Sequence, residues 1–170
     1  IDPETNIDFA TYVTAHEVAH QWWAHQVIGA NVEGATITSE TMAQYSAIMV
    51  MEHEYGKGMI ENFLKYELDS YLRGRARETK AENPLMYNQN QPYIHYRKGS
   101  LAMYALKDYI GEDKLNAALK SYVQKVAYQE APYTTSIEFV DYLRKATPDS
   151  LQYLIKDLFE TITLYGNETK

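Results

Sequence analysis

Apolar side chains recur at three- and four-residue intervals along almost the whole of this 170-residue chain, whereas runs that alternate apolar and polar residues are scarce. The first pattern is typical of amphipathic helices and the second of half-buried strands. The chain is therefore predicted to be all-α, and its length is sufficient for one domain with an apolar core. Helices are expected over residues 7–28, 39–54, 57–76, 98–111, 113–128, 135–145 and 148–161.

Helix-ending and helix-starting residues support the first of these boundaries. Gly29 is a plausible stop for the first helix, and Thr38 or Ser39 can cap the second. Residues 80–97 contain two prolines and several Asn and Gln residues, so we interpret them as a long loop. Long loops inside compact domains are often functional. A strand is expected to begin over 161–165.

Composition excludes several classes of protein. The chain has no cysteine, which excludes disulfides and any thiolate metal site. Its net charge of −7 argues against a nucleic-acid partner, which would require a basic face. No apolar run approaches the ~20 residues of a membrane span. Because the chain opens on Ile1 rather than methionine, we expect it to be a piece of a longer protein.

The most informative short motif is His16-Glu17-Val18-Ala19-His20, which lies inside the first predicted helix. Residues four apart on a helix lie one turn apart, so both imidazoles can reach one zinc ion. The glutamate between them projects beside the metal without binding it. It is then placed to accept a proton from a zinc-activated water.

The expected faces of this helix, at about 100° per residue, support a buried metal site. The histidine pair shares its side of the helix with the apolar residues Phe9, Val13, Trp23 and Val27. The opposite side carries Thr11, Thr14, Gln21 and His25. The alternative is a helix with two ordinary core histidines, but burying unpaired ionisable groups is costly and a metal removes that cost. His25 is interpreted as a surface residue.

A third metal ligand is expected, because catalytic zinc usually has three protein ligands and one open position. A third histidine in the pattern H-E-x-x-H-x-x-G-x-x-H is excluded, since Gln26 occupies its position. Glu40, at the start of the second predicted helix, is the preferred ligand. Glu33 is the alternative, although it lies in a loop and is less rigidly held. Glu52 and Glu54 lie several turns further along.

Three segments, in this order, carry a family resemblance: His16 to Trp23, Ser39 to Tyr45, and Tyr96-Arg97-Lys98-Gly99. They resemble the zinc helix, the following glutamate helix and the Tyr-x-Lys-Gly motif of the aminopeptidase N family of gluzincin metallopeptidases. The resemblance implies a zinc ion bound by His16, His20 and Glu40. It also implies that Glu17 is the catalytic base and that the Tyr96 hydroxyl stabilises the oxyanion of the reaction.

The same resemblance implies how the chain is organised. Residues 1–170 would form one helical fragment, the C-terminal lobe of a thermolysin-like catalytic domain. It would comprise zinc-site helices over 7–55, a tyrosine loop over 80–97 and C-terminal helices over 98–161. The sheet lobe of such a domain would precede the fragment. We therefore expect the zinc helix to expose a large apolar surface or to self-associate through it.

Two departures from the family pattern are informative. Ser39 and Thr41 stand where the family usually has Asn and Gly, and the spacing from His20 to Glu40 is one residue longer than usual. These changes resemble the branch that is fused to ABC-type permeases in bacterial membranes, which implies a membrane-associated parent. Gly58 to Asn62 looks like the family's amino-terminus-binding motif, but it follows the zinc helix and has helical spacing. Glu61 is therefore interpreted as a solvated helix residue.

The sequence thus predicts zinc-dependent hydrolysis of peptide bonds, with peptides as substrates and one Zn²⁺ as cofactor. Aminopeptidase activity in the longer parent is preferred, and the isolated fragment need not be active. The alternatives are a thermolysin-like endopeptidase and a zinc-stabilised binding module of a transporter-associated protein. An intact Glu17 argues against the last of these, because a purely structural zinc site does not require it.

Overall fold

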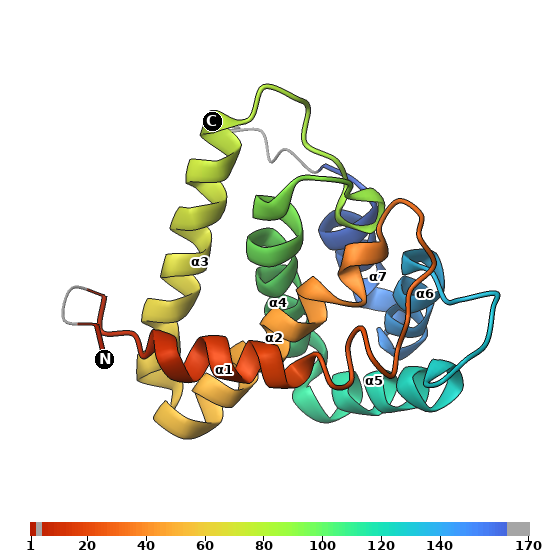
Figure 1. The fold of residues 1–170 in the computed structure, drawn as a ribbon, viewed down its shortest axis with the longest axis horizontal. Coiled ribbons are helices and arrows are strands. Elements are labelled where there is room, and N and C mark those ends of the chain that lie inside the picture. Colours follow the sequence, from red (N-terminus) through yellow and green to blue (C-terminus); the bar gives the residue numbers. More distant parts are fainter. Residues whose placement is uncertain (3–4, 163–170) are drawn as a thin grey trace.

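The computed structural model describes residues 1–2 and 5–162, and in these residues it contains helices, turns and loops but no named strand (Figure 1). The prediction of an all-α fold is therefore confirmed. The α-helices are α1 (Phe9–Ala19), α2 (Glu40–Tyr55), α3 (Lys57–Arg77), α4 (Gly99–Ile110), α5 (Glu112–Val126), α6 (Ser136–Ala146) and α7 (Gln152–Ile155). Shorter 3-10 or π turns are η1 (Ala35–Ile37), η2 (Leu85–Tyr87), η3 (Tyr93–Lys98), η4 (Asp149–Leu151) and η5 (Lys156–Glu160).

Helix α2 is the centre of the molecule, since it packs against α1, α3 and α4. Figure 1 shows α1 lying across the lower ends of α3 and α2, with α5, α6 and α7 grouped on the other side of α4. Half of the α2 side chains are buried, including the run from Thr41 to Tyr45. A helix that is enclosed in this way fixes the position of its first residue, Glu40, relative to α1.

The apolar core has two parts. The larger part joins α2 to α4, α5 and α6, and the fully buried Met42, Met103 and Phe139 belong to it. The smaller part joins α1 to α2 and α3 through Tyr12 and Phe63, whose ring centroids lie 4.1 Å apart. Each fully buried large apolar side chain stabilises the fold by about 1.5–3 kcal/mol. The smaller part therefore holds α1 against α2.

The predicted helix over 7–28 is wrong in its second half, because α1 ends at Ala19. The chain then folds through turns in which Ala24 has a φ of +104° and its N–H donates to the Val27 carbonyl, 3.1 Å away. Trp23 and Val27 are buried, but they reach the core from these turns rather than from the helix. Val13, which was expected on the buried face, is 52% exposed.

Two further expectations are corrected. The predicted loop over 80–97 contains η2, and it ends in η3, a π-helical turn that runs directly into α4. The predicted helix over 148–161 is divided into η4, α7 and η5. The strand expected over 161–165 lies mostly outside the described residues, which end at 162.

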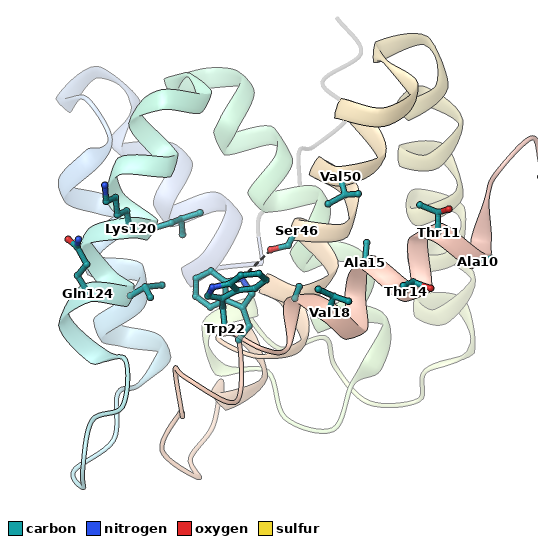
Figure 2. Close-up of a pocket in the computed structure, with 14 residues that line it drawn as sticks. Ala10, Thr11, Thr14, Ala15, Val18, Trp22, Ser46, Val50, Lys120 and Gln124 are labelled. Atoms are coloured by element: carbon teal, nitrogen blue, oxygen red, sulfur yellow. Dashed lines mark hydrogen bonds between the residues drawn. The ribbon is translucent and has the colours of Figure 1, made fainter.

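Helix α1 exposes apolar side chains on its outer side. A groove of about 870 Å³ lies between α1, α2 and α5 (Figure 2). Its apolar walls include Ala15, Val18, Trp22, Val50, Leu119 and Val123. Val18 and Trp22 are each about half exposed, at 51% and 49%. An exposed apolar surface on the helix that carries His16 is thus present, as the sequence led us to expect. None of the described helices combines the length and apolar character that a membrane span needs.

Candidate metal centre

The site begins with α1, whose first turn is firmly capped. The carboxylate of Asp8 accepts hydrogen bonds from the Thr11 N–H, 3.1 Å away, and from the hydroxyls of Thr11 and Tyr55. The bonds from Thr11, followed by that from Tyr55, lower the pKa of Asp8 to about 2. A capped first turn keeps the short helix ordered up to its C-terminal end, where His16 and His20 lie.

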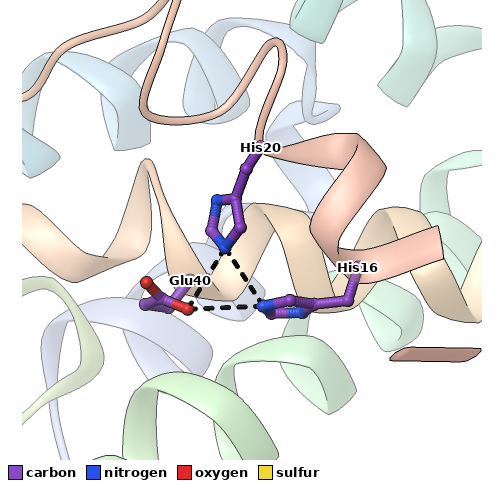
Figure 3. Close-up of side chains that lie close together, drawn as sticks. All are labelled: His16, His20 and Glu40. Atoms are coloured by element: carbon purple, nitrogen blue, oxygen red, sulfur yellow. Dashed lines mark hydrogen bonds and ion pairs between the residues drawn. The ribbon is translucent and has the colours of Figure 1, made fainter. Parts of the chain in front are cut away.

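Three ligand atoms converge beside this end of α1 (Figure 3). The Nε2 atoms of His16 and His20 are 3.2 Å apart. Oε2 of Glu40 lies 3.4 Å from the first of them and 3.6 Å from the second. Ligands about 2.0–2.2 Å from a tetrahedral zinc ion are separated by roughly 3.3–3.6 Å. The three side chains therefore have the spacing that one zinc ion requires.

The tautomer of His20 is also suited to a metal. Its Nδ1 lies 2.8 Å from the carbonyl oxygen of Trp23, so Nδ1 carries the proton and donates it to that carbonyl. The lone pair of Nε2 then faces Glu40 and His16. Because α1 ends at Ala19, the chain can turn back and bring the Trp23 carbonyl to this position. A backbone acceptor behind a ligating histidine is the usual outer-shell partner.

His16 is the more enclosed of the two histidines, with 8% of its surface exposed. Its Nδ1 is buried and has no hydrogen-bond partner among the described residues. A zinc ion on Nε2 would hold the ring neutral, with its proton on Nδ1, because metal binding uses the neutral imidazole. The residues present therefore fit a zinc ion in both spacing and chemistry.

Glu40 is the first residue of α2, and it lies beside both histidines as expected. Its pKa falls to about 2, chiefly because of the hydrogen bond with His16 and then that with Tyr96, while burial acts in the opposite direction. The next residue, Thr41, donates its hydroxyl to the carbonyl oxygen of His95 at 2.6 Å. This bond ties the start of α2 directly to the segment that carries Tyr96.

Tyr96 lies on η3 beside these three side chains. Its ring centroid is 5.9 Å from that of His16 and 4.5 Å from that of the buried His95. Burial, together with the hydrogen bond and charge of Glu40, raises the pKa of Tyr96 to about 12. The negative charge of Glu17 acts on the phenol in the same direction. The phenol consequently keeps its proton near neutral pH and can act as a donor.

Glu17 lies between the two histidines on α1, and its side chain is exposed. A carboxylate in this position can reach a molecule that enters from solvent. The other acidic candidates do not approach the histidines. Glu33 and Glu54 are exposed, and Glu52 pairs with Lys107 at a distance of 2.7 Å. Glu61 is exposed on α3, as expected for a solvated helix residue.

His25 is exposed, which agrees with its interpretation as a surface residue. Its Nδ1 lies 2.6 Å from the carbonyl oxygen of His20, so it packs on the end of α1 rather than joining the ligand atoms. His25 is therefore not part of the group that His16 and His20 form with Glu40.

Sequence reasoning missed two buried carboxylates behind the site. Glu67 on α3 is fully buried and pairs with Arg97, and Glu82 pairs with Lys98. For Glu67 a signal exists in the chain. Ile60 and Phe63 are buried on α3, and Glu67 follows them at helical spacing on the same face. For Glu82, which lies in the loop before η2, we find no such signal.

Sequence and structure comparisons find proteins of a known family that are similar to this chain. The sequence profile described as the peptidase family M1 domain matches residues 2–160. Human endoplasmic reticulum aminopeptidase 2 is 26% identical over 140 residues, which are 76% of this chain and 14% of that protein. Rat endoplasmic reticulum aminopeptidase 1 is 24% identical over 132 residues, 70% of this chain and 13% of that protein. The chain therefore spans about one seventh of these curated relatives.

Solved structures share the fold. The M1 zinc metallopeptidase from Deinococcus radiodurans superposes with a TM-score of 0.67 and 23% identity, covering 91% of this chain and 34% of that one. A variant of that enzyme bound to a Tyr-Ser-Ala substrate superposes with a TM-score of 0.69. The helices described above thus correspond to about a third of a longer metallopeptidase chain.

Proposed function

This chain belongs to peptidase family M1, and from that premise we propose that it carries the zinc-binding and catalytic residues of an aminopeptidase. His16, His20 and Glu40 hold one zinc ion, Glu17 is the catalytic base, and Tyr96 stabilises the oxyanion. The described helices form the helical lobe of an M1 catalytic domain. The activity belongs to the intact protein that carries this sequence, and its substrates are peptides.

One observation carries the proposal. Two imidazole nitrogens and one carboxylate oxygen from two helices lie within 4.8 Å of one another, at the mutual spacing of zinc ligands. The two imidazole nitrogens lie 3.2 Å apart, and both face the partly buried carboxylate of Glu40. Three protein ligands and a free fourth position are the arrangement of catalytic rather than structural zinc.

When bound, zinc would supply Lewis acidity, lowering the pKa of water toward neutrality and polarising the peptide carbonyl. The exposed Glu17 accepts the proton of the attacking water and later delivers it to the leaving amine. His20 keeps its proton on Nδ1 throughout, where it donates a hydrogen bond to the Trp23 carbonyl. The assignment of His20 uses the tautomer that this hydrogen bond favours.

Tyr96 donates its hydroxyl proton toward the oxygen on which negative charge develops. Its raised pKa leaves the phenol protonated, and its ring lies beside His16 on the same side as the ligand atoms. Preorganised donors of this kind typically contribute on the order of 10²–10³ in rate. Because η3 carries Tyr96, the position of the hydroxyl depends on this turn being well ordered.

The test is Glu17→Gln in the intact protein, with the exposed Glu61→Gln as the matched control. Rates are measured on amino-acid arylamides and on internally quenched peptides, with and without a zinc chelator. Loss of a general base lowers the rate by about 10²–10⁴, so Glu17→Gln should retain zinc and lose activity on arylamides, whereas Glu61→Gln should match the wild type.

Near-normal turnover of Glu17→Gln would refute the role of the base. Faster cleavage of internally quenched peptides than of arylamides would identify an endopeptidase instead. Absence of cleavage of both substrates by a wild-type protein that retains zinc would favour the zinc-stabilised binding module.

A further inference from the structure

The fully buried side chain of Glu67 takes no part in the proposed reaction, yet its carboxylate connects three elements around the site. Its Oε1 accepts hydrogen bonds from Tyr12 at 3.0 Å, from Gln44 at 3.1 Å and from Arg97 at 2.9 Å. Its other oxygen is buried without a partner among the described residues. One atom in the middle of α3 thus collects three donors.

Each donor comes from a different element and adjoins a residue of the metal centre. Tyr12 lies on α1, four residues before His16. Gln44 lies on α2, four residues after Glu40. Residues four apart on a helix lie one turn apart on the same face. The oxygen of Glu67 is therefore one helical turn behind both ligand-bearing positions.

The third donor reaches the tyrosine segment. Arg97 directly follows Tyr96 on η3, and its guanidinium also lies 5.4 Å from the ring of Tyr66. Charge-assisted hydrogen bonds of this kind are about twice as strong as neutral ones. Of the three links that Glu67 makes, the one to η3 is also an ion pair, because Arg97 carries a charge whereas Tyr12 and Gln44 are neutral donors.

Further residues of α3 also support the contact between α3 and η3. Tyr71 and Arg75 follow Glu67 at intervals of four residues, and both reach Glu82, at 2.9 Å and 3.0 Å. Glu82 in turn pairs with Lys98, the last residue of η3. Two buried carboxylates therefore hold two consecutive residues that follow Tyr96, and α3 is the support against which this turn rests.

Stability alone does not account for this cluster. Replacing buried ion pairs by apolar side chains is often neutral or stabilising. Apolar packing is non-directional, so an apolar cluster would not specify which three segments meet at one atom. The geometry points to a role in register. We propose that Glu67 is a positioning residue that fixes α1, α2 and η3 relative to one another, and thereby sets zinc affinity and the placement of Tyr96.

The proposal rests on the proposed function for its catalytic readout but not for its structural one. Glu67→Leu removes the acceptor from all three donors. In the metal-free chain, amide hydrogen exchange of residues 93–98 should then accelerate, and zinc affinity, measured by competition with a chromophoric chelator, should fall by on the order of 10-fold or more, the scale seen for outer-shell partners. The control is Ile60→Val, which loosens the same buried face of α3 without touching Glu67.

A second variant separates the links. In Glu67→Gln with Arg97→Met, an acceptor oxygen remains for Tyr12 and Gln44, while the unpaired cation is removed. This protein should fold and keep its zinc affinity, but kcat in the intact protein should fall by about 10-fold or more, because misplacing a reacting group by 1 Å can cost about 10² in rate. A lowered kcat with an unchanged zinc affinity would not result from overall destabilisation of the fold.

Unchanged hydrogen exchange in 93–98 in Glu67→Leu would overturn the proposal, whether or not the chain binds zinc. The proposal would also be overturned if zinc affinity and kcat fell only in proportion to the loss of stability, as expected for Ile60→Val. A wild-type protein without zinc or activity would instead refute the proposed function, and hydrogen exchange would still decide the role of Glu67.

Discussion

Two glycines of the same helix allow the contact between α3 and η3 to be tested by one added methyl group. A Cβ placed on Gly74 would lie 2.3 Å from Cβ and 2.7 Å from Cγ of Tyr93, whereas a Cβ on Gly58 meets no atom within 4 Å. Carbon atoms in contact are about 3.5–4.0 Å apart. Gly74→Ala must therefore move α3 and η3 apart by roughly 1.2–1.7 Å, taking the difference from that contact distance.

The magnitudes follow from this separation. Replacing glycine by alanine stabilises a helix interior by about 0.8–1 kcal/mol, and overpacking a well-packed contact costs about 1–3 kcal/mol. The propensity gain is common to both variants in the same helix. The free energy of unfolding of Gly74→Ala should therefore be lower than that of Gly58→Ala by about 1–3 kcal/mol.

Urea denaturation followed by circular dichroism measures this difference directly. With an m-value of about 2 kcal/mol/M, a 2 kcal/mol difference separates the two midpoints by about 1 M. Gly74→Ala should also lower kcat of the intact protein, because η3 carries Tyr96. Midpoints that coincide, or a Gly74→Ala protein more stable than Gly58→Ala, would refute the close approach of α3 to Tyr93.

Two further predictions concern single side chains. Tyr96→Phe should lower kcat by on the order of 10²-fold while zinc content stays unchanged; equal loss of zinc would show that the tyrosine has another role. The charge of Asp8 should stabilise the fold at neutral pH, since its pKa is lowered from 3.8 to about 2 in the folded chain. The stability difference between the wild type and Asp8→Asn should be complete above the unfolded pKa and should disappear as the pH falls toward 2. Urea unfolding at several pH values measures this difference. A difference that does not depend on pH would contradict the capping account.

Much of the candidate site was accessible from the sequence because its chemistry is local. His16 and His20 need only a helix between them to share one metal, and α1 supplies that helix. Glu40 was preferred over Glu33 because a helix holds a ligand more rigidly than a loop, and it is Glu40 that lies beside both histidines. The roles of these residues remain predictions until zinc and activity are measured.

What the sequence did not predict depends on contacts between distant segments. The periodic pattern continued past Ala19, but Trp23 and Val27 reach the core from turns, and only the folded chain shows that the Trp23 carbonyl caps His20. Glu67 falls on an apolar face of α3, where a charged residue has no local explanation. Its partners come from sequence separations of 55, 23 and 30 residues, which no local pattern connects.

The resemblance to the permease-fused branch rests on Ser39 and Thr41, and it also stays a prediction. The structure does give Thr41 a role that glycine could not fill. Its hydroxyl donates to the His95 carbonyl, and its side chain occupies the space beside Gly99, where a Cβ would lie 2.7 Å away. Gly99 closes the Tyr-x-Lys-Gly segment, so the substitution at Thr41 and that glycine are sterically matched.

Zinc stoichiometry tests the central claim most directly. The chain is loaded with zinc, freed of excess metal and analysed by plasma mass spectrometry, alongside His20→Ala and the surface control His25→Ala. The account predicts one zinc ion per chain in the wild type and in His25→Ala, and its loss in His20→Ala. A wild-type chain that retains no zinc, or a His20→Ala chain that retains it fully, would contradict the assignment of His16, His20 and Glu40 as the metal centre.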